Sequence, residues 1–211
     1  MEHIRLKISL IQMDVVCNDF YANLGRAEAL INKALKQRKK PNVLVLPEMW
    51  ASDMERNSGQ KHNVLYVLDK LKDIAARHSV NIVAGSMIEN RGERDAFNTA
   101  YIIDRQGNII ASYDQVHCPR HQKLSTGSNA VTFDIDGICC GIILGYDLRF
   151  PEFVRQLALK GAKVLFVSGM CPGPREIHWK LLNIVRAIEN QFFVVAVNRA
   201  GTTGNVAYPG M

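Results

Sequence analysis

The sequence predicts an α+β protein in which helices pack on mixed β-sheets. Segments with the periodicity of strands alternate with segments that have the periodicity of helices. One pair of strands is separated only by a tight turn, which favours an antiparallel hairpin, whereas the alternation favours parallel strands joined through helices. No internal repeat or linker interrupts the 211 residues, so we expect a single domain over 1–211.

The first half of the chain contains three predicted strands and two predicted helices. Residues 4–10 alternate apolar with polar side chains, as a half-buried strand does, and residues 42–48 form the continuous apolar run of a buried parallel strand. Apolar stripes at helical spacing predict amphipathic helices over 20–37 and 64–75. A further strand is predicted over 81–86.

The second half begins with the hairpin and then returns to alternation. Strands over 98–104 and 109–117 flank the turn 105–108, in which Gly107 supplies the backbone freedom that a tight turn requires. The remaining predicted elements are strands over 131–135, 137–144, 162–169 and 192–201 and helices over 151–158 and 174–190.

The ends of the predicted strands indicate where a ligand would bind. In folds of this kind, ligands lie outside the carboxyl ends of the strands. In this sequence those ends carry Glu48, Gly145, the turn 168–172 and Asn198. We therefore expect one cavity that is lined by all four.

Residues 145–152, GYDLRFPE, form a strand-to-helix elbow. They follow an apolar strand directly and contain a Pro-Glu pair that is typical of a helix start. Enzymes often mount a nucleophile at such an elbow, but the apex residue here is Gly145, which has no side chain. Glycine also relieves the backbone strain expected at an elbow. Polar residues nearby are expected to form a structural network; they are Asp147, Arg149, Glu152, Arg186 and Glu189.

Composition and charge argue against several other functions. No apolar run approaches the ~20 residues that span a membrane, and basic residues are not interleaved with aromatic ones as in nucleic-acid-binding proteins. The five cysteines are odd in number and lack CxxC spacing, which favours reduced thiols. The histidines form no metal-binding pattern. We expect a cytoplasmic protein with no cofactor or metal and with no nucleic-acid or membrane partner.

Four segments resemble the hallmark segments of one family. VLVLPEMW (43–50), YDQVH (113–117), GYDLRFPE (145–152) and AIENQFFVVAVNRAG (187–201) are similar to those of the nitrilase superfamily of carbon–nitrogen hydrolases, in the same order. Within the superfamily the chain looks most like amidase-like members that act on small amides. The resemblance implies a four-layer α-β-β-α sandwich and a homodimer. Because members continue with further strands, it also implies that this chain is truncated at its C-terminus.

The resemblance also implies a mechanism, of which this sequence keeps only part. Family members use a cysteine nucleophile, a glutamate base and a lysine that stabilises the oxyanion. In this sequence Glu48 falls at the base position, Gln115 at the lysine position and Gly145 at the nucleophile position. Gln122 is the nearest match to a second glutamate of the family, and Tyr146 and Cys171 are also expected to contact the substrate.

These replacements predict a site that is inactive or strongly impaired. Without a thiol no acyl-enzyme can form, and a lost charge-assisted oxyanion donor costs roughly 3 kcal/mol or more. The alternatives are an amidase that uses Cys171 as a relocated nucleophile, with Glu48 or His178 as base, and water attack directed by Glu48. A structural or assembly role is a third reading. Glu48 itself either recognises an amine or amide or is a strand-end acid bonded to loop backbone. A small amide or carboxylate is the kind of ligand that we expect for the protein.

Overall fold

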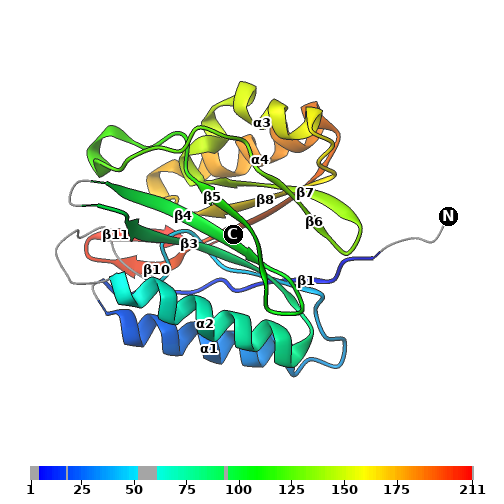
Figure 1. The fold of residues 1–211 in the computed structure, drawn as a ribbon. Coiled ribbons are helices and arrows are strands. Elements are labelled where there is room, and N and C mark those ends of the chain that lie inside the picture. Colours follow the sequence, from blue (N-terminus) through cyan, green and yellow to red (C-terminus); the bar gives the residue numbers. More distant parts are fainter. Residues whose placement is uncertain (1–4, 18, 52–60, 93–94, 211) are drawn as a thin grey trace.

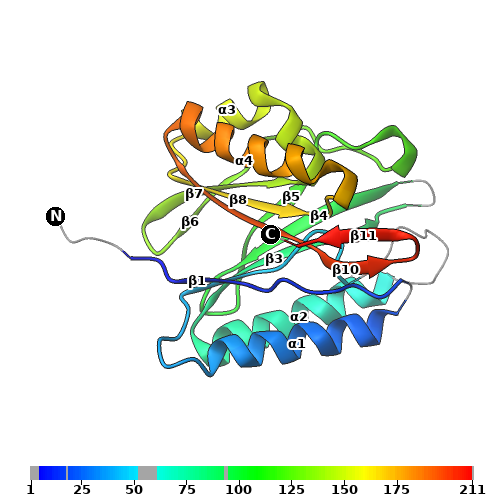
Figure 2. The same ribbon diagram turned by 180° about the vertical axis from the view of Figure 1, so that it is seen from behind.

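A computed structural model describes residues 5–17, 19–51, 61–92 and 95–210, with the side chains of 61–63 excepted. The chain forms four layers, with two β-sheets packed face to face and a pair of helices on each outer face (Figure 1; Figure 2). The helices are α1 (Phe20–Leu35), α2 (Lys61–His78), α3 (Pro151–Leu159) and α4 (Glu176–Asn190). This arrangement confirms the predicted four-layer α-β-β-α sandwich.

The first sheet has five strands in the order β1-β2-β3-β4-β5. The strands β1, β2 and β3 are parallel, whereas β4 and β5 are added as antiparallel neighbours. The strands of this sheet are β1 (Ile8–Leu10), β2 (Val43–Val45), β3 (Asn81–Asn90), β4 (Ala96–Ile103) and β5 (Ile109–Asp114). The predicted hairpin is therefore β4–β5, and Gly107 adopts the positive φ of 86° that its turn requires.

The second sheet has four strands in the order β6-β7-β8-β9. An antiparallel β6–β7 pair leads into the parallel strands β7, β8 and β9. The strands of this sheet are β6 (Thr132–Ile135), β7 (Ile138–Leu144), β8 (Val164–Gly169) and β9 (Phe193–Asn198). The chain ends in a separate two-stranded hairpin of β10 (Ala200–Thr203) and β11 (Val206–Pro209).

Side-chain alternation along β2 divides the core into two parts. Val43 and Val45 lie in the core between the two sheets, together with side chains of β7 and β8. Leu44 lies on the opposite face, in the core that α1 and α2 cover. Because β2 is buried on both faces, its sequence is a continuous apolar run, as expected for a central parallel strand.

Three sequence-based boundaries need correction. The first predicted strand begins at Ile8, since residues 5–7 are not in a strand and Ile4 lies outside the described residues. The elbow does not enter α3 directly, because a 3-10 helix spans Gly145–Arg149 first. The last predicted strand ends at Asn198, since the buried Arg199 side chain turns back to donate hydrogen bonds to the backbone carbonyls of Glu48 and Met49.

None of the helices in the described part of the chain has the length and apolar character that a membrane span requires.

Two glycines provide a matched test of packing. A Cβ atom on Gly169 would lie 2.4 Å from two ring carbons of the buried Trp179, so we expect Gly169→Ala to lower the free energy of unfolding by about 1–3 kcal/mol. Gly25 lies in α1 with no atom within 4 Å of such a Cβ, so Gly25→Ala should raise the free energy of unfolding by about 0.5–1 kcal/mol. Urea unfolding measures both values. Shifts of the same sign would contradict this account.

Candidate active site

One cavity of about 650 Å³ opens at the carboxyl ends of the strands, as the topology predicts. Residues from α4 and β11 complete its wall. The six residues that the family resemblance places at catalytic or substrate-binding positions all line it: Glu48, Gln115, Gln122, Gly145, Tyr146 and Cys171. Asn198 was expected in the wall but is not part of it. Its side chain instead brackets Cys171, accepting from the backbone N–H at 2.7 Å and donating to the carbonyl at 2.9 Å.

Glu48 follows β2 and is buried at the cavity wall. Its Oε1 accepts a hydrogen bond from Asn98 Nδ2, and its Oε2 accepts one from the backbone N–H of Met170, both at 2.9 Å. Burial raises the pKa of Glu48 to about 7, and Asp147 adds to this effect while Arg199 opposes it. Glu48 is therefore bonded to loop backbone and also faces the cavity, so the two readings of this acid are compatible.

Gly145, at the apex of the elbow, lies against the Glu48 carboxyl group. A Cβ atom on this residue would be 2.4 Å from Glu48 Oε2, so the carboxyl group fills the space in which a side chain would begin. The φ angle of Gly145 is not in the left-handed region. The expectation that glycine relieves backbone strain here is therefore wrong, and a side chain at this position would instead require the end of the Glu48 side chain to shift.

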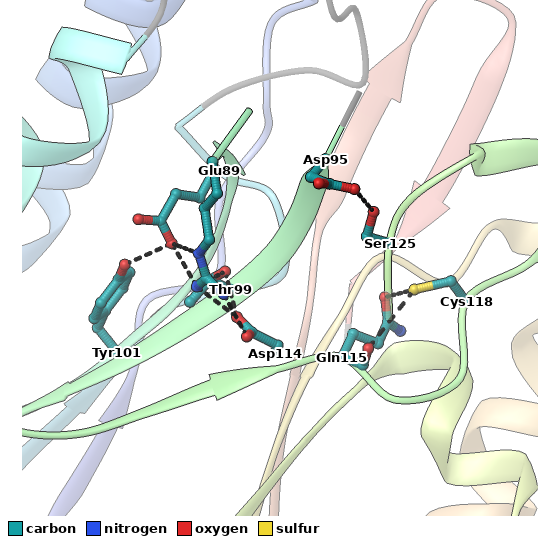
Figure 3. Close-up of polar contacts among 9 residues, drawn as sticks. Glu89, Asp95, Thr99, Tyr101, Asp114, Gln115, Cys118 and Ser125 are labelled. Carbon is teal, nitrogen blue, oxygen red and sulfur yellow. Dashed lines mark hydrogen bonds and ion pairs between the residues drawn. The ribbon is translucent and has the colours of Figure 1, made fainter. Parts of the chain in front are cut away.

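Gln115 follows β5 and is buried. Asn98 Nδ2, which also bonds Glu48, donates to Gln115 Oε1 at 2.9 Å. The thiol of Cys118 lies 3.5 Å from the same oxygen (Figure 3). Gln115 Nε2 has no hydrogen-bond partner within the described residues. The amide oxygen is thus held by the protein, whereas the amide nitrogen keeps unused hydrogen-bonding capacity.

A polar cluster fixes the end of β5 just before Gln115. Arg91 donates to both carboxylate oxygens of Asp114, at 2.6 and 2.8 Å. Thr99 on β4 also donates to Asp114, and Glu89 on β3 accepts from Arg91 and Tyr101 (Figure 3). A bidentate Arg–carboxylate pair sets orientation as well as distance. The cluster therefore ties β3, β4 and β5 together where Gln115 enters the cavity.

The elbow is held by a fully buried carboxylate. Asp147 accepts hydrogen bonds from the backbone N–H groups of Leu144 and His117 and from the Tyr113 hydroxyl. Arg186 on α4 donates twice to the Leu148 carbonyl and pairs with Glu189. Asp147 and the Arg186–Glu189 pair therefore hold the elbow by separate contacts, and Glu152, which was also expected in this network, is exposed. Arg149 instead lines the cavity.

Two thiols lie near the cavity, and neither is activated. The Cys171 thiol contacts the backbone oxygens of Arg175 and Pro172, and burial raises its pKa against the opposing effect of Arg149 and Arg175. Burial likewise raises the pKa of Cys118 to about 12. The reactive form of cysteine is the thiolate, which a raised pKa disfavours.

The mouth of the cavity is positively charged. Arg149, Arg175 and two histidines, His121 and His178, line it, and Arg149 lies 3.2 Å from His178 Nδ1. Glu48 is the only acidic side chain among the lining residues that the structure describes. No group of three His, Cys, Asp or Glu side chains within the described residues could hold a metal ion.

Sequence reasoning missed several residues that shape the site. Asn98 interrupts an apolar strand with a buried amide, and that interruption was a signal that could have been used. The backbone N–H of Met170 and the part of β11 that lines the cavity had no comparable signal. Both depend on how distant segments are brought together.

Known proteins resemble this chain over nearly all of its length. The family model for carbon-nitrogen hydrolases matches residues 7–210. A 2-oxoglutaramate amidase of Bacillus subtilis is 38% identical over 218 residues, covering 96% of this chain and 80% of that protein. A hydrolase in the agr operon of Staphylococcus aureus is 35% identical, covering 97% of this chain and 81% of that protein.

Solved structures share the fold. A variant of the amidase from Nesterenkonia sp. AN1 in complex with butyramide has a TM-score of 0.87 at 23% identity, covering 96% of this chain and 80% of that one. Nit3 of Saccharomyces cerevisiae has a TM-score of 0.85 at 26% identity, covering 96% of this chain and 79% of that one. With the fold, the family match and these relatives in agreement, this chain belongs to the carbon-nitrogen hydrolase family, in the amidase-like branch of the nitrilase superfamily.

Proposed function

We propose that this protein binds small amides and carboxylic acids in its cavity and does not form the thioester of family chemistry. The observation that carries this proposal is the contact between Gly145 and Glu48. A carboxyl oxygen fills the space beside the elbow in which a nucleophilic side chain would begin. By contrast, the related amidase from Nesterenkonia has an active-site cysteine to which acrylamide adds.

Unpartnered polar atoms support an amide or acid as the ligand. Gln115 Nε2 is a buried donor without a partner, and Gln122 Oε1 is a buried acceptor without one, within the described residues. Both residues line the cavity. Leaving such a group unpaired costs about 1–3 kcal/mol. A primary amide offers one acceptor and two donors, so it can satisfy both atoms at once.

The charge at the mouth supports a second, acidic end on the ligand. Arg149 and Arg175 line the entrance, whereas the only acid in the described lining is the buried Glu48. A ligand with an amide at one end and a carboxylate at the other matches this distribution. The name of the 2-oxoglutaramate amidase relative describes an acid of this kind. We therefore propose short ω-amides of acids as the preferred ligands.

The first test separates binding from catalysis by a relocated thiol. We expect no hydrolysis of butyramide, and no hydroxamate when hydroxylamine is added to trap an acyl thioester. Ammonia release measures hydrolysis, and mass spectrometry measures both the hydroxamate product and any acyl adduct on the intact protein. Cys171→Ala is expected to behave like the unmodified protein, because the pKa of Cys171 is raised and its thiol contacts backbone carbonyls. Sustained turnover that Cys171→Ala abolishes would overturn the proposal.

The second test rebuilds the family's groups. Gly145→Cys restores a thiol, but its Cβ displaces Glu48 Oε2 and weakens the hydrogen bond from Met170. Adding Gln115→Lys supplies an ammonium donor, so we expect weak amidase activity that exceeds that of Gly145→Cys alone by about 10²-fold. Butyramide hydrolysis measures it. Gly145→Ala with Gln115→Lys is the matched control and should stay inactive. A rebuilt variant no more active than this control would contradict our reading of positions 115 and 145.

We further propose that the protein forms a homodimer through α4. Five large apolar side chains on this helix are exposed by 43% to 71%: Ile177, Leu181, Ile184, Val185 and Ile188. They recur at a spacing of three or four residues, so they share one side of the helix. Monomers rarely expose apolar patches larger than a few hundred Å². A second copy of the chain, placed with its own α4 against this one, would cover both patches.

Charge substitutions on this helix test the dimer. Ile184→Glu with Ile188→Glu places two charges in the apolar stripe, and we expect it to convert a dimer into a monomer. Light scattering after size-exclusion chromatography measures the mass of each form. Leu65→Glu on α2 is the control, since Leu65 is equally exposed but lies on the opposite outer layer. An unmodified protein that is monomeric at all concentrations would contradict this proposal.

A further inference from the structure

The wall of the cavity contains one acid and one amide that share a single anchor. Asn98 Nδ2 donates to Glu48 Oε1 and to Gln115 Oε1, each at 2.9 Å. The two acceptor oxygens are therefore neighbours, although they come from different strands of the first sheet. Glu48, Gln115 and Asn98 are all almost completely buried. Glu48 and Gln115 both line the cavity, and Gln115 Nε2 is a buried donor that has no partner within the described residues.

These two groups fit different ligands in the two protonation states of Glu48. Gln115 Nε2 is a donor in both states and suits a carbonyl or carboxylate oxygen. An ionised Glu48 can only accept, so it suits the NH₂ group of a primary amide. A neutral Glu48 has an O–H group that can donate, so it suits the second oxygen of a carboxylate. An ionised Glu48 would instead repel that oxygen in a buried site.

We propose that Glu48 selects the ligand by its protonation state, binding primary amides when it is ionised and carboxylates when it is neutral. This inference rests on the proposed function, because it requires the cavity to bind both ligand classes. Glu48 is thereby a specificity-determining residue. When a carboxylate binds to the ionised form, one proton passes from solvent to the Glu48 carboxyl group, and no covalent bond to the ligand forms or breaks.

The surroundings of Glu48 allow this proton to move near neutral pH. Burial, aided by Asp147, raises its pKa to about 7, although Arg199 opposes the shift. The Arg199 guanidinium donates to the backbone carbonyls of Glu48 and Met49. The nearby thiols of Cys118 and Cys171 have raised pKa values and stay neutral in this range.

Other groups that can carry charge also line the cavity, namely Arg149, Arg175, His121 and His178. A positive charge on any of them would attract the butyrate carboxylate, but it would not change the binding of neutral butyramide in the opposite direction. Affinities that change with pH in opposite directions for an amide and its matching acid are therefore specific to Glu48.

The experiment compares butyramide with butyrate, which differ only in the group that meets Glu48. Isothermal titration calorimetry measures the affinity of each at pH 6 and pH 8, where butyrate stays ionised. With a pKa of about 7, the neutral fraction of Glu48 falls from about 0.9 to about 0.1 over this range. We therefore expect butyrate affinity to fall about tenfold and butyramide affinity to rise about tenfold.

The matched variant is Glu48→Gln, whose carboxamide has a donor and an acceptor at every pH. Because this side chain does not ionise, the affinity for butyramide should no longer change between pH 6 and pH 8. A measurement on the unmodified protein avoids any folding defect of the variant. Titrations at pH 8 in buffers with different ionisation enthalpies should show the uptake of about one proton for each butyrate bound.

The outcomes separate this inference from the proposed function. If both probes bind but their affinities do not change with pH in opposite directions, or if butyrate binds without proton uptake, the proposal that Glu48 selects the ligand is wrong. The proposed binding function would still stand. If butyramide affinity depends on pH in a folded Glu48→Gln variant as it does in the unmodified protein, the proposal that Glu48 selects the ligand is also wrong. If neither probe binds at either pH, both the inference and the proposed function are wrong.

Discussion

The Asp147 carboxylate joins the two sheets beneath the cavity, and the geometry of the site depends on it. It accepts hydrogen bonds from Tyr113 on β5 of the first sheet and from Leu144 on β7 of the second. A third bond comes from the backbone of His117 in the loop after β5. A buried charge is tolerated only when it is well hydrogen-bonded. Removing any one of these donors would therefore destabilise the buried carboxylate and the hydrogen bonds that remain. The elbow and the strand that precedes Gln115 are therefore fixed relative to each other.

Glu48 is a second buried carboxyl group, and its surroundings differ from those of Asp147. Asp147 accepts from several donors that belong to the framework, whereas Glu48 accepts one bond from Asn98 and one from the backbone of Met170. Fewer donors compensate less for the loss of water, so burial raises the pKa of Glu48 to about 7. Asp147 holds the elbow and the end of β5 together, whereas fewer hydrogen bonds compensate for the burial of Glu48.

Most of the fold could be predicted from the sequence because its signals are local. The apolar run of β2, the amphipathic stripe of α1 and the turn at Gly107 each depend on a short segment. The β10–β11 hairpin was missed although it too has a local signal, since only Gly204 and Asn205 separate its paired strands and Gly204 has a positive φ. The six site residues that the family resemblance indicates line one cavity, but the resemblance did not reveal Asn98, which bonds residues 50 and 17 positions away in the chain.

The residues at positions 48, 115 and 145 form one consistent set. An ammonium group at position 115 would stabilise an ionised Glu48 and lower its pKa, whereas the neutral amide of Gln115 does not. A side chain at position 145 would push the Glu48 carboxyl group away from the Met170 N–H, whereas Gly145 leaves room for it. Gln115 and Gly145 therefore both favour a buried Glu48 whose pKa is raised. At the Glu48 end of the cavity the neutral amide of Gln115 carries no charge, whereas Arg149 and Arg175 keep fixed positive charge elsewhere in the lining.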